Sequence, residues 1–177
     1  MAQKTDKTAE YYSAGLEIEE TGHAFYQKTS RNSKNEMGKK LFGMLADDEL
    51  VHMERIKSIY GSLKKGREWL LNWKKMPIKH PDIRQIFISL AEKNKDQIKP
   101  DSSDLEALDV GLDLENRSIN YYEKHLKEST SDMEKEFLQQ MVREEQTHHR
   151  LLSDMKFYLT NPESWYVEHE KHGLDGA

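Results

Sequence analysis

Residues 45–52 read LADDELVH, and residues 141–149 read MVREEQTHH. Each segment contains a glutamate followed three residues later by a histidine, Glu49 with His52 and Glu145 with His148. A separation of three residues places both side chains on one face of an α-helix, one turn apart. The two motifs are 96 residues apart, which indicates that the chain repeats one structural unit.

The same offset of 96 residues extends well beyond the two motifs. It relates Glu19 to Glu115 and Tyr26 to Tyr122. An internal repeat of one helical hairpin predicts a bundle with pseudo-two-fold symmetry and a site on its axis.

Four long stretches without proline are rich in Glu, Lys, Leu, Met and Ala, which favour helix. They predict helices over roughly 8–30, 34–63, 103–129 and 131–159. Three serines precede a glutamate at the spacing of a capping box and are the predicted N-caps: Ser33 before Glu36, Ser103 before Glu106, and Ser131 before Glu134.

Residues 64–102 form a long connector, in which an apolar pattern predicts a shorter helix over roughly 82–96. In the tail, residues 160–177, Asn161-Pro162 is typical of an N-cap followed by a helix, which should end by Gly173. We therefore expect a single all-α domain over residues 1–177. Its predicted architecture is a four-helix bundle of two repeated hairpins with a long crossover connection and a short C-terminal helix.

The composition argues against several classes of protein. Of the 177 residues, 36% are hydrophobic and 33% charged, and the net charge is −5. We expect no membrane span and no signal peptide, hence a cytoplasmic protein. The acidic balance argues against a nucleic-acid partner. The chain contains no cysteine, which excludes disulfides, zinc ribbons and iron–sulfur clusters built from these residues.

In each of the four long predicted helices, core positions recur at alternating steps of three and four residues and form a stripe along one face. A glutamate interrupts each of these apolar stripes near its middle. Burying four carboxylates without partners is costly, and no Lys or Arg lies in the central stripes. Bound metal ions would compensate the charge. A polar network, or charges that remain in solvent, is the alternative.

The segments EIEETGHAFY (17–26), LADDELVH (45–52), DLENRSINYY (113–122) and MVREEQTHH (141–149) carry a family resemblance. Over nearly all of residues 8–160 the chain resembles the rubrerythrin-like branch of the ferritin-like superfamily. The resemblance implies a ferritin-like bundle with two bound iron ions, in which Glu49 and Glu145 bridge the metals and each histidine caps one. The implied ligands are Glu19, Glu49, His52, Glu115, Glu145 and His148. Such a donor set suits iron or manganese, so a manganese or mixed-metal site stays open.

The resemblance also implies an oxidoreductase that reduces hydrogen peroxide or dioxygen. Two departures from the family are visible. Without cysteine the chain cannot form a rubredoxin site, so the electrons should come from an external donor protein. Ser118 stands where rubrerythrins carry a further glutamate, which argues for a six-residue site. The alternatives are an iron-storing ferroxidase, a di-iron oxygenase with an organic substrate, and a structural metal.

Several other residues have open roles. Tyr26 and Tyr122 are expected in the core, where they could hydrogen-bond the ligand carboxylates. His23 could be a further ligand, although a hydrogen-bonded or edge-facing histidine is the preferred interpretation. Aromatic residues outside the stripes either cover the flank of the bundle or form the surface of an expected homodimer: Trp69, Trp73, Trp165 and Tyr166.

Overall fold

The computed structural model describes residues 2–65, 71–93 and 102–174. Four long helices dominate this part of the chain: α1 (Ala2–Asn32), α2 (Glu36–Lys64), α4 (Ser102–Glu128) and α5 (Asp132–Thr160). Three shorter elements are the 3-10 helix η1 (Leu71–Lys75), α3 (Ile83–Lys93) and α6 (Pro162–Leu174). The described residues contain no strand, so the expected all-α class is confirmed.

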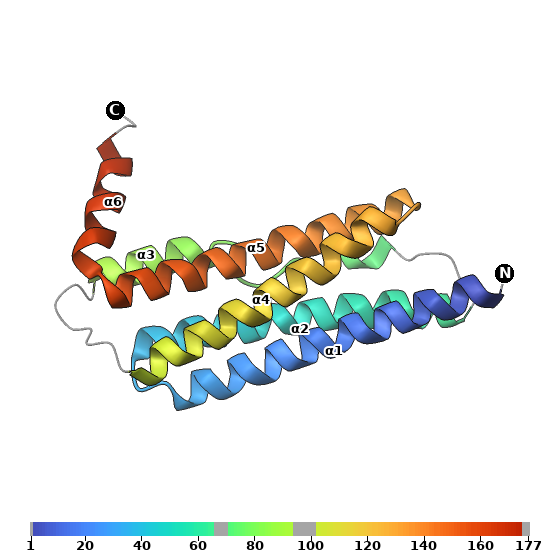
Figure 1. Ribbon diagram of the computed structural model, residues 1–177, viewed down its shortest axis with the longest axis horizontal. Coiled ribbons are helices and arrows are strands. Elements are labelled where there is room, and N and C mark those ends of the chain that lie inside the picture. The colour runs from blue at the N-terminus through green and yellow to red at the C-terminus, as the bar shows by residue number, and fades with distance from the viewer. Residues whose placement is uncertain (1, 66–70, 94–101, 175–177) are drawn as a thin grey trace.

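The long helices form two antiparallel hairpins, α1 with α2 and α4 with α5, which lie side by side (Figure 1). Three-residue loops join the helices of each hairpin, as expected. Helix α2 ends at one end of the bundle and α4 begins at the other, so the crossover spans the length of the bundle (Figure 1). Helix α3 packs against α5, and α6 turns away from the end of α5.

The starts of the helices were predicted only in part. Ser131 is the N-cap of α5, with its hydroxyl accepting from the Glu134 amide, as expected. The N-cap of α2 is Asn35 rather than Ser33, because the Asn35 side chain accepts from the amides of Met37 and Gly38 at 2.9 and 3.1 Å.

Other helix boundaries also differ from the predicted ones. Helix α4 already begins at Ser102, so Ser103 lies inside the helix, and α1 begins at Ala2 instead of residue 8. Helix α3 runs from Ile83 to Lys93, and residues 94–96 of the predicted helix lie outside the described residues. The tail helix α6 starts at Pro162 behind Asn161, as predicted, and continues to Leu174.

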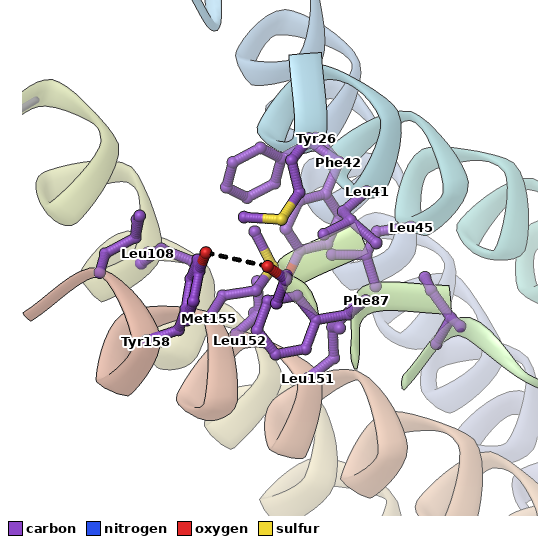
Figure 2. Packing of buried hydrophobic residues seen from close by; sticks show 14 of the residues in the cluster. Tyr26, Leu41, Phe42, Leu45, Phe87, Leu108, Leu151, Leu152, Met155 and Tyr158 are labelled. Carbon is purple, nitrogen blue, oxygen red and sulfur yellow. Dashed lines mark hydrogen bonds between the residues drawn. The ribbon is translucent and has the colours of Figure 1, made fainter. Parts of the chain in front are cut away.

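Two apolar clusters form the core, one on each side of a polar centre. Figure 2 shows the first, in which Tyr26, Phe42 and Leu45 meet residues of α5 and Phe87 of α3. The second contains Tyr12, Ile56, Ile59, Trp73, Tyr122, Phe137, Leu138, Met141 and Val142. The two clusters therefore shield the polar centre from water along the bundle axis.

The aromatic residues outside the stripes cover the flank of the bundle. Trp165 is fully buried, with ring centroids 5.5 Å from Phe87 and 5.2 Å from Tyr158. Trp73 is buried against Phe137, while Tyr166 is half-buried. Trp69 lies outside the described residues. Trp73 and Trp165 are thus unavailable as an exposed dimer surface, and homodimer formation stays a prediction.

None of the helices in the described part of the chain is both long and apolar enough to cross a membrane.

Candidate metal centre

The four glutamates and two histidines singled out in the sequence lie together between the apolar clusters. Helices α1 and α4 contribute one glutamate each, and α2 and α5 contribute a glutamate and a histidine each. All six side chains are at most 3% exposed: Glu19, Glu49, His52, Glu115, Glu145 and His148. The glutamate and histidine of α2 and of α5 are one turn apart, and all four helices turn these residues inward. The six side chains therefore lie at one level of the bundle.

Their ligand atoms form two overlapping groups. Glu19, Glu49, His52 and Glu145 present oxygen and nitrogen atoms within 4.8 Å of one another. Glu49, Glu115, Glu145 and His148 do the same. Glu49 and Glu145 belong to both groups, which is the arrangement that two bridging carboxylates require. Each group adds one glutamate and one histidine of its own.

Both histidines turn Nδ1 toward the carboxylates. His52 Nδ1 lies 2.9 Å from a Glu145 oxygen and 3.3 Å from a Glu19 oxygen. His148 Nδ1 lies 3.4 Å from a Glu49 oxygen and 3.7 Å from a Glu145 oxygen. The two Nδ1 atoms are therefore the nitrogen donors of the two groups.

The opposite ring nitrogens face two further buried carboxylates. His52 Nε2 is 3.0 Å from Glu144, and His148 Nε2 is 3.6 Å from Asp48. A carboxylate behind a metal-binding histidine fixes the ring orientation and its tautomer. The pattern of core positions did not predict this pair, although Asp48 and Glu144 are also 96 residues apart and each directly precedes a glutamate shared by both groups.

The two supporting carboxylates are held differently. Asp48 accepts hydrogen bonds from the backbone amides of Lys79 and His80 in the connector, at 2.8 and 3.0 Å. Glu144 is paired with the buried Arg55 guanidinium, whose Nε donates to the Met76 carbonyl at 2.7 Å. The residue 96 positions after Arg55 is leucine, so this cation breaks the symmetry of the repeat.

The two tyrosines cross between the hairpins. Tyr26 on α1 donates to Glu115 on α4, and Tyr122 on α4 donates to Glu19 on α1. Each phenol orients the glutamate of the other helix. Glycines 96 residues apart make room beneath them: a Cβ at Gly15 would lie 3.8 Å from the Tyr122 hydroxyl, and one at Gly111 would lie 3.5 Å from the Tyr26 hydroxyl and 3.1 Å from Leu152.

Burial and mutual contact set the protonation of the cluster. Burial and the nearby Glu145 raise the pKa of Glu19 and Glu115 well above the usual range. Burial opposes the charge on Glu49 too, but contacts with His148 and His52 outweigh it and lower the Glu49 pKa to about 2. The pKa of Glu145 is lowered in the same manner, chiefly by His52.

The pKa values of the two histidines are both raised. Burial disfavours the imidazolium, but the surrounding carboxylates outweigh it and raise the pKa of both His52 and His148. Two cationic rings then balance two ionised glutamates, while the remaining two glutamates keep their protons. Two divalent ions would balance all four carboxylates in the same space, so the donor set fits a dinuclear metal site.

The pattern of unpartnered atoms supports the same fit. Glu115 Oε2 and both ring nitrogens of His148 are buried without a hydrogen-bond partner among the described residues. Buried polar atoms are rarely left in this state, and a metal ion would satisfy Glu115 Oε2 and His148 Nδ1.

A model of the family described as Rubrerythrin matches residues 10–156. The chain belongs to the rubrerythrin family. The expected ferritin-like bundle is therefore confirmed at the level of fold and family. No curated protein and no solved structure matches the chain significantly.

In this rubrerythrin-family chain, two residues beside the centre lie outside the groups of ligand atoms. His23 lies in neither group of ligand atoms, and its Nδ1 is 2.9 Å from the Ala46 carbonyl oxygen of α2. His23 thus matches the preferred interpretation of a hydrogen-bonded histidine rather than a further ligand. Ser118 is buried beside the centre at 4% exposure, but its hydroxyl has no hydrogen-bond partner in the described structure.

Proposed function

We propose that this rubrerythrin-family chain is a di-iron oxidoreductase that reduces a peroxide or dioxygen with electrons from an external donor. One observation carries the proposal: two four-residue ligand groups share Glu49 and Glu145 and are buried between apolar clusters. Two iron ions held by these residues would supply the electrons for the reduction of a peroxide or dioxygen.

The residues of the chain have distinct tasks in this proposal. Iron, when bound, supplies one electron per ion to the oxidant. Glu49 and Glu145 hold the two sites together, and the Nδ1 atoms of His52 and His148 complete one site each. Glu144 holds the His52 ring by a hydrogen bond and Asp48 lies behind the His148 ring, while the phenols of Tyr26 and Tyr122 orient the two terminal glutamates. The flanking apolar clusters exclude water along the bundle axis.

The source of electrons follows from composition. A rubredoxin-type iron site needs cysteine thiolates, and the 177 residues contain none. The reducing equivalents are therefore proposed to come from a redox centre outside these 177 residues.

The test begins with anaerobic loading of the protein with Fe(II) and quantification of bound iron. We expect two ions per chain, one for each ligand group. Peroxide and dioxygen are then added in separate experiments while the absorbance of the diferric product is followed. Faster oxidation by peroxide than by dioxygen would identify peroxide as the preferred oxidant.

A matched pair of variants separates the site from the helix that carries it. Glu49→Ala removes a shared ligand and should abolish both stoichiometric loading and the optical change. Glu54→Ala removes an exposed glutamate of the same helix and should behave as wild type. One bound ion or none in the wild-type protein would contradict the dinuclear site.

A second candidate function is an oxygenase acting on an organic substrate. It is favoured by a cavity of about 290 Å³ that opens onto the ligand glutamates between α1 and α4. Under steady reduction, an oxygenase would consume dioxygen in proportion to an oxidised organic product, whereas a peroxidase would not.

A further inference from the structure

The cavity over the metal centre lies between α1 and α4. Its floor is formed by carboxylates of the centre, and it extends outward to the surface between the two helices. The lining residues that matter here are Ile18, Leu114, Gly22, Ser118, Glu17 and Arg117. A molecule in this cavity would lie directly against the ligands of the proposed metals.

Two small residues keep the cavity open. Gly22 follows Glu19 by one turn, and Ser118 follows Glu115 by one turn, so they occupy equivalent positions of the repeat. A Cβ at Gly22 would lie 3.5 Å from the Glu49 carboxyl carbon, an ordinary contact distance. A side chain there would occupy the space above the centre without striking the backbone.

Ser118 supplies a polar group that nothing in the described structure satisfies. The residue is 4% exposed, and its Oγ has no hydrogen-bond partner there. Leaving a buried hydroxyl unpaired is unfavourable, so a bound ligand that accepts or donates a hydrogen bond at this point would be stabilised there.

The walls define the chemistry of the ligand. Ile18 and Leu114 face the cavity as an apolar pair from equivalent positions of the repeat, while Glu17 and Arg117 line it with opposite charges. Once two divalent ions balance the four ligand glutamates, the remaining lining charges cancel. The cavity therefore suits a neutral molecule with a small apolar body and a polar end.

The size of the cavity leaves room for an occupant larger than hydrogen peroxide. The cavity measures about 290 Å³, whereas one water molecule occupies about 30 Å³ of the liquid. Two metal ions, each smaller than a water molecule, leave most of this space. It is also near the lower end of the range of pockets that bind small organic molecules, roughly 300–1,000 Å³.

We propose that the cavity binds compact, neutral organic hydroperoxides, ROOH. The alkyl group packs against Ile18 and Leu114, the Ser118 hydroxyl bonds the peroxide group, and the oxygen end faces the ligand glutamates. This inference rests on the proposed function and names its substrate class. In the reaction the O–O bond breaks, and ROOH with two electrons and two protons gives ROH and water. Two ferrous ions, when bound, would supply the two electrons, the external donor would restore them, and the protons would come from solvent.

The first test measures binding without redox chemistry. The protein is loaded with redox-inert Zn(II) and titrated with tert-butanol, the alcohol product of tert-butyl hydroperoxide. Saturable shifts of the backbone NMR signals around Gly22 and Ser118 are expected. Ser118→Leu, which fills the cavity, should abolish them, and Gly61→Ala should not, because a Cβ at Gly61 meets nothing within 4 Å. Absence of saturable shifts in the wild-type protein would overturn the proposal.

The second test compares two oxidants on the Fe(II)-loaded protein. Ser118→Leu is expected to lower the oxidation rate with tert-butyl hydroperoxide at least tenfold more than the rate with hydrogen peroxide. Gly22→Ala should shift the ratio in the same direction, and Gly61→Ala should leave it unchanged. Equal effects on both oxidants in these variants, with wild-type iron content, would overturn the proposal.

The two failures can be told apart. If hydrogen peroxide oxidises the iron but tert-butyl hydroperoxide does not, the cavity proposal fails and the proposed function stands. If neither peroxide reacts, the peroxidase function fails together with the hydroperoxide proposal. In that case binding of tert-butanol to the zinc protein would favour the oxygenase alternative.

Discussion

Single hydroxyl groups orient the terminal glutamates of the centre. Tyr122 reaches from α4 to Glu19 on α1, across the interface of the hairpins. Residues that hold metal ligands in place typically change metal affinity by about 10–100-fold when altered. We therefore expect Tyr122→Phe to fold normally and to weaken metal binding by about tenfold.

The control for this variant is the neighbouring tyrosine. Tyr121 donates to the Tyr11 backbone carbonyl at 2.6 Å and does not contact the centre. In a competition titration against a chelator, Tyr121→Phe should match the wild-type affinity. Equal affinities for Tyr122→Phe and wild type would show that the phenol has no part in orienting Glu19.

Protonation at the same residues predicts how metal binding depends on pH. The raised pKa values of Glu19, Glu115, His52 and His148 mean that burial and the neighbouring carboxylates favour the protonated forms of these groups in the metal-free protein. Each must lose its proton to bind a metal. Loading should release up to four protons, one from each group, and affinity should rise with pH. Titration in weak buffer with a pH indicator measures this release, and proton uptake would contradict the assignment.

Helix α2 depends on a buried cation that links it to α5 and the connector. Arg55 is 2% exposed and pairs with Glu144 while donating to the Met76 carbonyl. Removing one member of a buried pair costs about 3–5 kcal/mol, because the other charge stays buried without compensation. Arg55→Leu should lower the free energy of unfolding of the metal-free protein by this amount, measured in urea.

The double variant Arg55→Leu/Glu144→Gln tests the cause of that loss. Because Glu144→Gln removes the uncompensated charge, the double variant should recover part of the stability, and the cycle should show coupling. Arg143→Leu, at an exposed arginine of α5, is the control and should change stability by less than about 0.5 kcal/mol. Strictly additive effects would show that the two charges do not act as a pair.

The start of α2 offers a smaller test of helix stability. Asn35 accepts hydrogen bonds from two backbone amides that the helix itself leaves free. Replacing such a cap with alanine costs about 1 kcal/mol. Asn35→Ala should therefore lower the midpoint of urea unfolding with an unchanged slope. An unaltered midpoint would mean that solvent replaces the cap without loss.

The four helices and the six clustered residues were predictable because both depend on helical period. Residues on one stripe face one way, and a repeat at a fixed offset places equivalent residues at one level. Asp48 and Glu144 were missed because they lie next to the stripe, about 100° around the helix, where a charge usually faces solvent. Ser33 has the capping-box spacing to Glu36, but Asn35, which directly precedes the helix, makes the cap hydrogen bonds. The crossing of the tyrosines depends on how the hairpins face each other, which no pattern within one helix contains.

At the scale of the whole molecule, the centre joins the two hairpins. One ligand group takes residues from α1, α2 and α5, and the other takes residues from α2, α4 and α5. Without metal, the groups with raised pKa values favour folding at low pH and lose that contribution as the pH rises through their folded-state values. The metal-free protein should therefore lose stability as the pH rises above about 6.5, the ordinary pKa of histidine, while the metal-bound protein should not, because its ligands are already deprotonated.

Metal removal tests this link between the hairpins directly. A metal that binds only the folded state stabilises it by about 2.7 kcal/mol at a free concentration one hundred times the dissociation constant. Chelation should accordingly lower the midpoint of thermal unfolding, and by more at pH 8 than at pH 6. Glu145→Gln removes a ligand shared by both groups, so its midpoint should no longer respond to chelator or metal, as calorimetry would show. A wild-type midpoint that is the same with and without metal would mean that metal binding adds nothing to the contacts that hold α1–α2 and α4–α5 together.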